Sequence, residues 1–221
     1  HAFLPEIALH CYGQNVQFIC TPFSLKAVEE LLPYVDCYKI ASYELPWDEL
    51  LSACAQTGKP LILSTGMATM DEMRHAINVL LDDGCEQLTV LHCVSGYPAP
   101  IVDANLHAIE TIRTTCDVAT GWSDHTASPA VLYRAVHRWG ASLVEFHLDL
   151  DGTGDEFKAG HCWLPGQIAP VIAAIRDGER ADGDGVKQPQ GSEMADRAWR
   201  RDSSDGLRPT LAMREAWVRQ V

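Results

Sequence analysis

The sequence predicts a parallel α/β fold, and it favours a barrel of eight parallel strands over an open doubly wound sheet. Short apolar runs recur along the chain, and segments with helical periodicity separate them. The runs are continuously apolar, which is typical of parallel strands that are buried on both faces. A small polar cluster follows each run, so the strand ends are expected to surround one pocket, as they do in a barrel.

Six strand–loop–helix units can be followed in order. Residues 1–15 precede them and have the pattern of a helix tail and a turn. The expected strands are short and apolar, and they span residues 16–20, 37–40, 60–63, 88–92, 118–120 and 143–146. The expected helices follow these strands and span residues 24–32, 46–57, 70–82, 105–115, 127–139 and 165–176.

Capping residues support several of these helix ends. Ser24 is a suitable N-cap for the first helix, and Gly58 suits the position just after the second. Thr69 can cap the third helix, with Glu72 in its first turn. Beyond residue 176 the chain becomes polar and rich in glycine, so we predict two regions: a partial barrel over 1–176 and a linker or tail over 177–221 that carries a short helix near 211–218.

Composition excludes several classes of protein. The chain has 221 residues, 47% of them hydrophobic, and a formal net charge of −13, which does not suit a nucleic-acid binder. No apolar run is long enough to span a membrane, and the first residues lack the pattern of a signal peptide. The eight cysteines form no C-x-x-C pair and are expected to be free thiols. These features predict a cytoplasmic protein, and no dinucleotide or P-loop motif is present.

Hydroxyl groups and one lysine follow the expected strands and could hold a phosphate group. Hydroxyl and ammonium groups donate hydrogen bonds to phosphate oxygens, and the ammonium also neutralises charge. The residues in question are Thr21, Lys39, Ser42, Ser64, Ser95 and Ser123. The alternative for Lys39 is a structural ion pair with Glu44 or Asp36, and the hydroxyls could cap helices instead.

Two histidines at strand ends are candidate metal ligands. His125 lies in the string GWSDHT, and His147 ends the last expected strand. Neutral imidazoles on neighbouring strands could share one divalent first-row ion and leave positions open for substrate. Asp124 could orient an imidazole, and Glu145 is expected to point partly away from His147. The alternative is that the two histidines are unrelated and simply hydrogen-bonded.

Six strings, taken together, resemble the N-acetylneuraminate (sialic acid) synthase family, whose members make nonulosonic acids. These strings are TPFS, YKIAS, LSTGMAT, HCVSGYPAP, GWSDHT and EFHLDLDG, and they cover about residues 16–176 in order. The resemblance implies a TIM barrel and a transferase that condenses phosphoenolpyruvate with an N-acetylhexosamine, such as N-acetylmannosamine, and releases phosphate. It also implies a divalent metal, Mn²⁺ before Mg²⁺ or Co²⁺, and a homodimeric full-length parent.

The resemblance also implies roles for individual residues. His125 and His147 match the metal ligands, and together with Lys39 they are the expected catalytic groups. Thr21, Lys39, Ser42, Ser64 and Ser123 match the residues that hold phosphoenolpyruvate. Ser95 stands where some members have an asparagine, Tyr97 matches a tyrosine of the sugar site, and Asp155 or His161 could replace the aspartate of a GPD-type loop.

The chain departs from the family pattern at both ends. The strings AEIG and VKFQ of the family's first two strands are not found, so the six visible strands are interpreted as strands three to eight of a barrel. No antifreeze-like C-terminal domain is seen. Residues 1–221 alone are therefore expected to leave two apolar edge strands, 16–20 and 143–146, and to lack synthase activity.

Two other hypotheses remain open on the sequence. One is a different phosphoenolpyruvate aldol-type synthase, such as a 3-deoxy-octulosonate phosphate synthase, against which the strings GWSDHT and YPAP argue. The other is an inactive, truncated barrel that binds a sugar or a phosphate.

Overall fold

The chain forms two compact units, His1–Glu179 and Arg180–Val221, in a computed structural model that describes residues 3–219. The first unit contains a curled sheet of seven parallel strands. The strands are β1 (Ile19–Cys20), β2 (Cys37–Ile40), β3 (Leu61–Ser64), β4 (Leu88–Cys93), β5 (Ala119–Asp124), β6 (Val144–Leu148) and β7 (Cys162–Trp163).

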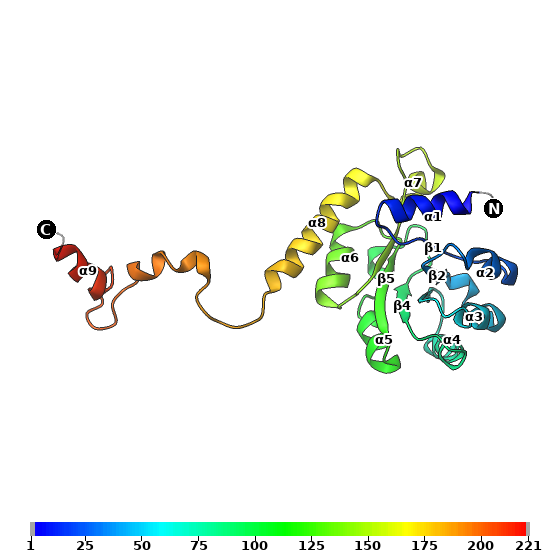
Figure 1. Ribbon diagram of the computed structural model, residues 1–221, viewed down its shortest axis with the longest axis horizontal. Coiled ribbons are helices and arrows are strands. Elements are labelled where there is room, and N and C mark those ends of the chain that lie inside the picture. Colours follow the sequence, from blue (N-terminus) through cyan, green and yellow to red (C-terminus); the bar gives the residue numbers. More distant parts are fainter. Residues whose placement is uncertain (1–2, 220–221) are drawn as a thin grey trace. The chain divides into compact units, whose positions relative to one another are not determined.

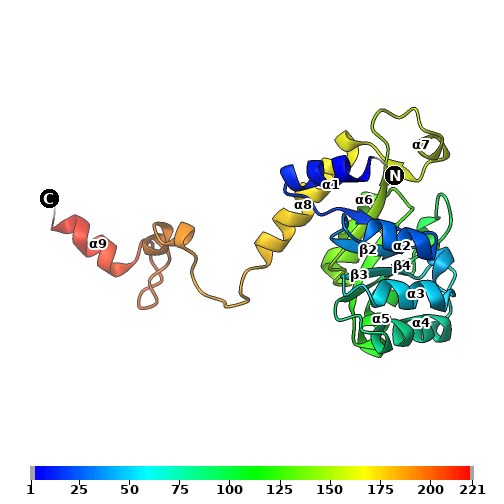
Figure 2. The ribbon, with the colours of Figure 1, turned by 45° about the vertical axis from the view of Figure 1, so that its right-hand side comes forward.

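Each strand pairs with the next strand in the sequence, so the order in the sheet is β1 to β7 without interruption. A doubly wound sheet would need a reversal of strand order, which is absent from the described sheet. Because parallel crossovers are right-handed, an uninterrupted order places the connecting helices on one side, and the sheet curls away from them. Figures 1 and 2 show α2, α3 and α4 side by side on the outer side of the curled sheet.

Nine α-helices lie within the described residues. Their bounds are α1 (Leu4–Gly13), α2 (Leu25–Leu31), α3 (Asp48–Ala55), α4 (Met70–Asp82), α5 (Ala108–Cys116), α6 (Pro129–Tyr133), α7 (Asp155–Ala159), α8 (Pro165–Asp182) and α9 (Leu211–Val218). A π-helical turn, Arg134–Arg138, continues α6, and 3₁₀ turns occupy Ser42–Glu44, Ile101–Asp103, Gly191–Glu193 and Asp196–Trp199. None of the described helices combines the length and the apolar character that crossing a bilayer requires.

The predicted caps of two helices are confirmed. The Ser24 hydroxyl accepts a hydrogen bond of 3.1 Å from the Ala27 amide at the start of α2. At the start of α4, Thr69 and Glu72 form a reciprocal capping box, in which each side chain accepts from the other residue's backbone amide. These caps are predictable from the sequence because the capping side chain and the amide that it accepts from lie within one turn of helix.

The prediction of six strands is wrong, since the sheet has a seventh, β7. This strand has only two residues, and the sequence before it, Gly160 and His161, carries no apolar run. β7 pairs with β6 at His147 and Leu148, just beyond the expected edge 143–146. The first expected strand, 16–20, is reduced to its last two residues.

Apolar side chains fill both sides of the sheet. The outer cluster under α2–α4 includes Ile40, Leu50, Leu63 and Leu80, all of which are fully buried. A second cluster under α5, α6 and α8 is centred on Trp122. On the inner face, a smaller cluster contains Cys37, Ile62 and Leu91, with Leu143 packed against it. Burial on both faces explains why the strands are apolar throughout.

Gly121 of β5 is a point of close backbone approach. A Cβ atom there would lie 2.3 Å from the Leu143 carbonyl oxygen and 2.6 Å from Leu91 Cδ2. We expect Gly121→Ala to lower the free energy of unfolding by about 2–3 kcal/mol, because backbone and core must shift to admit the methyl group. Denaturant unfolding measures this. Gly166→Ala in α8, where a Cβ would meet nothing within 4 Å, is the matched control, and equal stability of the two variants would contradict the prediction.

The second unit is described separately and contains no strand among its described residues. Its short helical turns are held by local side-chain contacts. The Asp202 carboxylate accepts hydrogen bonds from the Ser204 hydroxyl and from the Leu211 amide, and Arg214 pairs with Asp205. The rings of Trp199 and Trp217 pack edge to face at 5.7 Å.

Candidate active site

Side chains alternate between the two faces of each strand, so inward-facing residues at matching positions on neighbouring strands form successive layers of the site. Residues two positions apart share a face of a strand, so the residue two positions after each inner apolar residue also points inward. Cys37, Ile62, Leu91 and Leu143 form the apolar floor. The inner positions that follow them are Lys39, Ser64, Cys93 and Glu145, with Ser123 on β5 paired in register with both Cys93 and Glu145.

The centre of this layer is an ion pair between a buried lysine and a carboxylate whose side chain is 39% exposed. Lys39 Nζ lies 3.3 Å from Glu145 Oε2, and the Lys39 side chain is only 10% exposed. The same carboxylate oxygen accepts a hydrogen bond of 3.3 Å from the Ser64 hydroxyl. Lys39 therefore does have an acidic partner, but it is neither Glu44 nor Asp36.

Ser42 and Ser95 stand around the loop that follows β3. The Ser42 hydroxyl accepts a hydrogen bond of 2.9 Å from the Gly66 amide. A Cβ on Gly66 would lie 2.1 Å from Ser95 Oγ and 2.9 Å from Ser42 Oγ, so the two hydroxyls converge on this glycine. Ser95 Oγ is buried and has no hydrogen-bond partner among the described residues. Ser95, which follows β4, thus presents its hydroxyl beside Gly66 of this loop.

The two histidines occupy the next inward positions, two residues after Ser123 and Glu145. The ring centroids of His125 and His147 are 5.2 Å apart. His125 Nδ1 hydrogen-bonds the Val94 carbonyl oxygen at 2.8 Å, which fixes the ring and leaves Nε2 for another partner. The Tyr97 ring packs against His125 with centroids 4.2 Å apart. Two closely spaced imidazoles of this kind fit a divalent first-row ion.

Glu145 and His147 therefore lie on the same face of β6. The expectation that Glu145 points partly away from His147 is wrong, because residues at positions i and i+2 of a strand share a face. Lys39 and the histidine pair are consequently neighbouring layers of one site.

Three further groups beside His147 extend the site. Glu156 of α7 lies with Oε2 3.1 Å from His147 Nδ1 and 3.9 Å from His161 Nε2. Cys162 of β7 donates a weak hydrogen bond to the same oxygen at 3.7 Å. The hydrogen bond from His147 is the main reason that the pKa of Glu156 is lowered, and burial is the main reason that the pKa of His161 is lowered.

Cys93 also belongs to the inner layer, although the sequence predicts only that it is a free thiol. Burial favours its neutral form, but the hydrogen bond with His125, the charge of that ring, and hydrogen bonds with Ser123 and Ser42 together lower its pKa. For His125, burial disfavours the charged ring, yet the contacts with Cys93 and with Val94 raise its pKa. The thiol and the imidazole thus stabilise each other's charged forms.

Asp124 does not orient an imidazole. Its buried carboxylate accepts hydrogen bonds from the indole groups of Trp122 and Trp163 and from Thr126 and the Ala127 amide. It fixes the end of β5 and connects it to β7. The carbonyl oxygen of Val94 orients His125 instead.

Two of the expected site residues lie outside this group. Thr21 is half-buried in the loop after β1, and Asp155 is fully exposed and pairs with Lys158 at 3.6 Å. Asp155 is not brought to the histidines, whereas its neighbour Glu156 is. His92 is a packing residue, since it hydrogen-bonds the Ala104 carbonyl oxygen and its ring lies 5.3 Å from Trp122.

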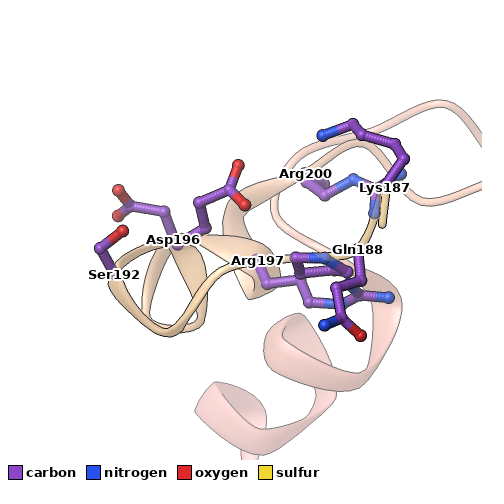
Figure 3. Close-up of a pocket in the computed structure, with 8 residues that line it drawn as sticks. Lys187, Gln188, Ser192, Asp196, Arg197 and Arg200 are labelled. Carbon is purple, nitrogen blue, oxygen red and sulfur yellow. The ribbon is translucent and has the colours of Figure 1, made fainter. Parts of the chain in front are cut away.

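A hollow of about 550 Å³ lies within the second unit. Its lining residues are Lys187, Gln188, Pro189, Ser192, Glu193, Asp196, Arg197 and Arg200. Figure 3 shows Ser192 and Asp196 on one side and Lys187 and Arg200 on the other. None of these lining residues is a histidine or a cysteine, and the hollow is separate from the strand-end residues described above.

A family model describing the NeuB family matches residues 2–187, which is most of the chain. The chain belongs to the NeuB family. It is 35% identical over 194 residues to the N,N'-diacetyllegionaminic acid synthase of Campylobacter jejuni, with 86% of this chain and 57% of that protein covered. It is 38% identical over 153 residues to the pseudaminic acid synthase of Helicobacter pylori, with 68% and 44% covered.

A solved structure agrees with this assignment. The N-acetylneuraminic acid synthetase of Leptospira borgpetersenii matches with a TM-score of 0.76 and 30% identity, over 87% of this chain and 68% of that one. This NeuB-family chain spans about half the length of the curated relatives it matches, 53%, 57% and 56% for three of them. Three of these relatives are named as synthases or a synthetase of legionaminic, pseudaminic and N-acetylneuraminic acid.

Proposed function

We propose that the protein carrying this chain condenses phosphoenolpyruvate with an N-acetylated amino sugar to a nonulosonic acid and releases phosphate. The single observation that carries this proposal is the Lys39–Glu145–Ser64 arrangement. A carboxylate oxygen already lies 3.3 Å from both the Lys39 ammonium and the Ser64 hydroxyl. An anionic oxygen of phosphoenolpyruvate would meet the same two donors at that position.

The residues fit a divalent ion beside this anion site. His125 and His147 would hold it, with Mn²⁺ proposed ahead of Mg²⁺ and Co²⁺, and it would supply Lewis-acid polarisation of the sugar aldehyde. The two rings occupy the inward-facing positions two residues after Ser123 and Glu145. The aldehyde and the anion would therefore be held side by side.

The chain's own groups then position the reaction. Lys39 and Ser64 hold the phosphate, and the buried Ser95 hydroxyl and Ser42 extend the same donor set. Carbon 3 of the enol attacks the aldehyde carbon, water adds to carbon 2, and phosphate leaves with cleavage of the carbon–oxygen bond. Holding both substrates in a fixed orientation would increase the rate of the condensation, because the enol carbon and the aldehyde carbon no longer have to find each other in solution.

The sugar is proposed to lie against Tyr97. Its ring is 43% exposed and lies within 6 Å, between centroids, of His125, His147 and His161. An aromatic face at that place can pack against the apolar face of a sugar ring. We propose N-acetylmannosamine or a related N-acetylhexosamine as the acceptor. Activity assays with a panel of free and phosphorylated amino sugars would identify which one is used.

Lys39→Ala tests the anion site. The variant is expected to weaken binding of phosphoenolpyruvate by about 30- to 700-fold, equivalent to ~2–4 kcal/mol, because a charge-assisted contact is lost from a buried site. Isothermal titration calorimetry measures the change. Lys26→Ala is the control, since Lys26 is 80% exposed and pairs with Glu30 on the surface of α2. Wild-type affinity in Lys39→Ala would show that the lysine serves only its ion pair with Glu145.

A further inference from the structure

A second group of metal-ligand residues lies beside the histidine pair, and four different side chains contribute to it. One ligand atom from each of His147, Glu156, His161 and Cys162 lies within 4.8 Å of the other three. Two imidazoles, a carboxylate and a thiol form a mixed nitrogen, oxygen and sulfur set. That combination is typical of zinc and related first-row ions rather than of magnesium or calcium.

The spacing within the group fits tetrahedral coordination. Bonds of the lengths found for zinc place neighbouring ligand atoms about 3.3–3.8 Å apart in a tetrahedron. Measured from Glu156 Oε2, the distances are 3.1 Å to His147 Nδ1, 3.9 Å to His161 Nε2 and 3.7 Å to Cys162 Sγ. Small rotations of an exposed glutamate would make these distances nearly equal.

The burial of His161 is an independent indication. The residue is 5% exposed, and its Nδ1 atom has no hydrogen-bond partner among the described residues. The Nε2 atom lies 3.9 Å from Glu156 Oε2, which is too long for a hydrogen bond. An ion bound at Nε2 would give this buried ring a coordinating partner on that side.

The backbone holds the group in a short stretch of chain. His147 of β6 and Cys162 of β7 are partners in register on adjacent strands. The helix α7 between them carries Glu156 and ends at Ala159, and the φ of 100° at the following Gly160 turns the chain toward His161. Trp163, next to Cys162, is anchored by its indole hydrogen bond of 3.2 Å to Asp124. Rigid elements therefore supply three of the four ligands.

We propose that His147, Glu156, His161 and Cys162 bind a zinc-class divalent ion, with Cys162 as a thiolate that releases its proton to solvent on binding. This site differs from the one proposed for His125 and His147, because it uses the Nδ1 side of His147 together with three residues of α7, β7 and the loop between them. With both ions bound, the His147 ring would bridge them as an imidazolate and would also release its N–H proton to solvent. It does not depend on the condensation reaction. Loss of His125 would remove the proposed catalytic ion but leave this site intact.

Cobalt substitution tests the proposal directly. Protein freed of metal with a chelator and loaded with Co²⁺ is expected to show a thiolate-to-cobalt charge-transfer band in the near ultraviolet. X-ray absorption of the zinc form should show one sulfur at about 2.3 Å. Cys162→Ser should abolish the band, and Glu156→Gln, which alters an exposed side chain, should weaken zinc binding at least tenfold.

Two variants act as controls. Cys93→Ser and His125→Ala should both keep the band, because the Cys93 sulfur lies beside His125 rather than within this group. Persistence of the band in Cys162→Ser would overturn the proposal, and so would its loss in Cys93→Ser or the absence of a sulfur shell in wild type. Unchanged zinc affinity in Glu156→Gln would also contradict it, by showing that the carboxylate only hydrogen-bonds His147.

Discussion

Replacing Asp124 with alanine is expected to lower the free energy of unfolding by about 3–5 kcal/mol. The side chain is completely buried, and it accepts hydrogen bonds from five donors: the indoles of Trp122 and Trp163, the amide and hydroxyl of Thr126, and the Ala127 amide. Alanine would leave all five without their acceptor. The loss should be largest around β7, because the bond from Trp163 connects that two-residue strand to β5.

Guanidinium unfolding measures the change in stability. Asp124→Asn, which keeps one carbonyl oxygen, should lose less than the alanine variant. Asp103→Ala changes an exposed carboxylate and should stay within about 0.5 kcal/mol of wild type. If Asp124→Ala were as stable as Asp103→Ala, the carboxylate would not be the anchor described here.

His125→Ala is expected to reduce the rate of condensation by about a thousandfold, or ~4 kcal/mol, in the protein as encoded. The variant removes one of the two imidazoles proposed to hold the divalent ion, and with it the ring against which Tyr97 packs at 4.2 Å. Because Lys39, Ser64 and Glu145 are untouched, affinity for phosphoenolpyruvate should change much less than the rate.

Steady-state kinetics with both substrates separates these effects. His75→Ala is the matched control, since this exposed histidine pairs with Asp48 and is not one of the strand-end residues of the site. It should keep its rate within about twofold, as surface substitutions usually do. A His125→Ala enzyme with a normal rate would place the ion elsewhere.

Much of the fold was predictable because its signals are local. Strands β2, β3 and β4 are apolar runs that occupy two buried faces, and the Thr69 capping box lies within one turn of helix. β7 was missed because two residues give no pattern. Its position depends on pairing with β6 and on the bond between Trp163 and Asp124, both of which are contacts at a distance in the sequence.

The partners within the site were harder to predict than its members. Lys39 pairs with Glu145, more than a hundred residues away, whereas the sequence offered only nearby acids. Alternation along β6 could have placed Glu145 and His147 on one face, since one residue separates them. Glu156 and Cys162 give almost no signal in the sequence, because the fold of α7 brings Glu156 to His147 and the register of β6 with β7 brings Cys162.

The most direct test of the proposed function follows the bridging oxygen of phosphoenolpyruvate. With ¹⁸O at the carbon–oxygen–phosphorus bridge, the protein as encoded, supplied with Mn²⁺ and N-acetylmannosamine or a related amino sugar, should release phosphate that carries the label. Release should require the sugar and should fall in Lys39→Ala. Unlabelled phosphate, or release that is independent of every N-acetylated sugar tried, would contradict a condensation at the Lys39 and histidine layers.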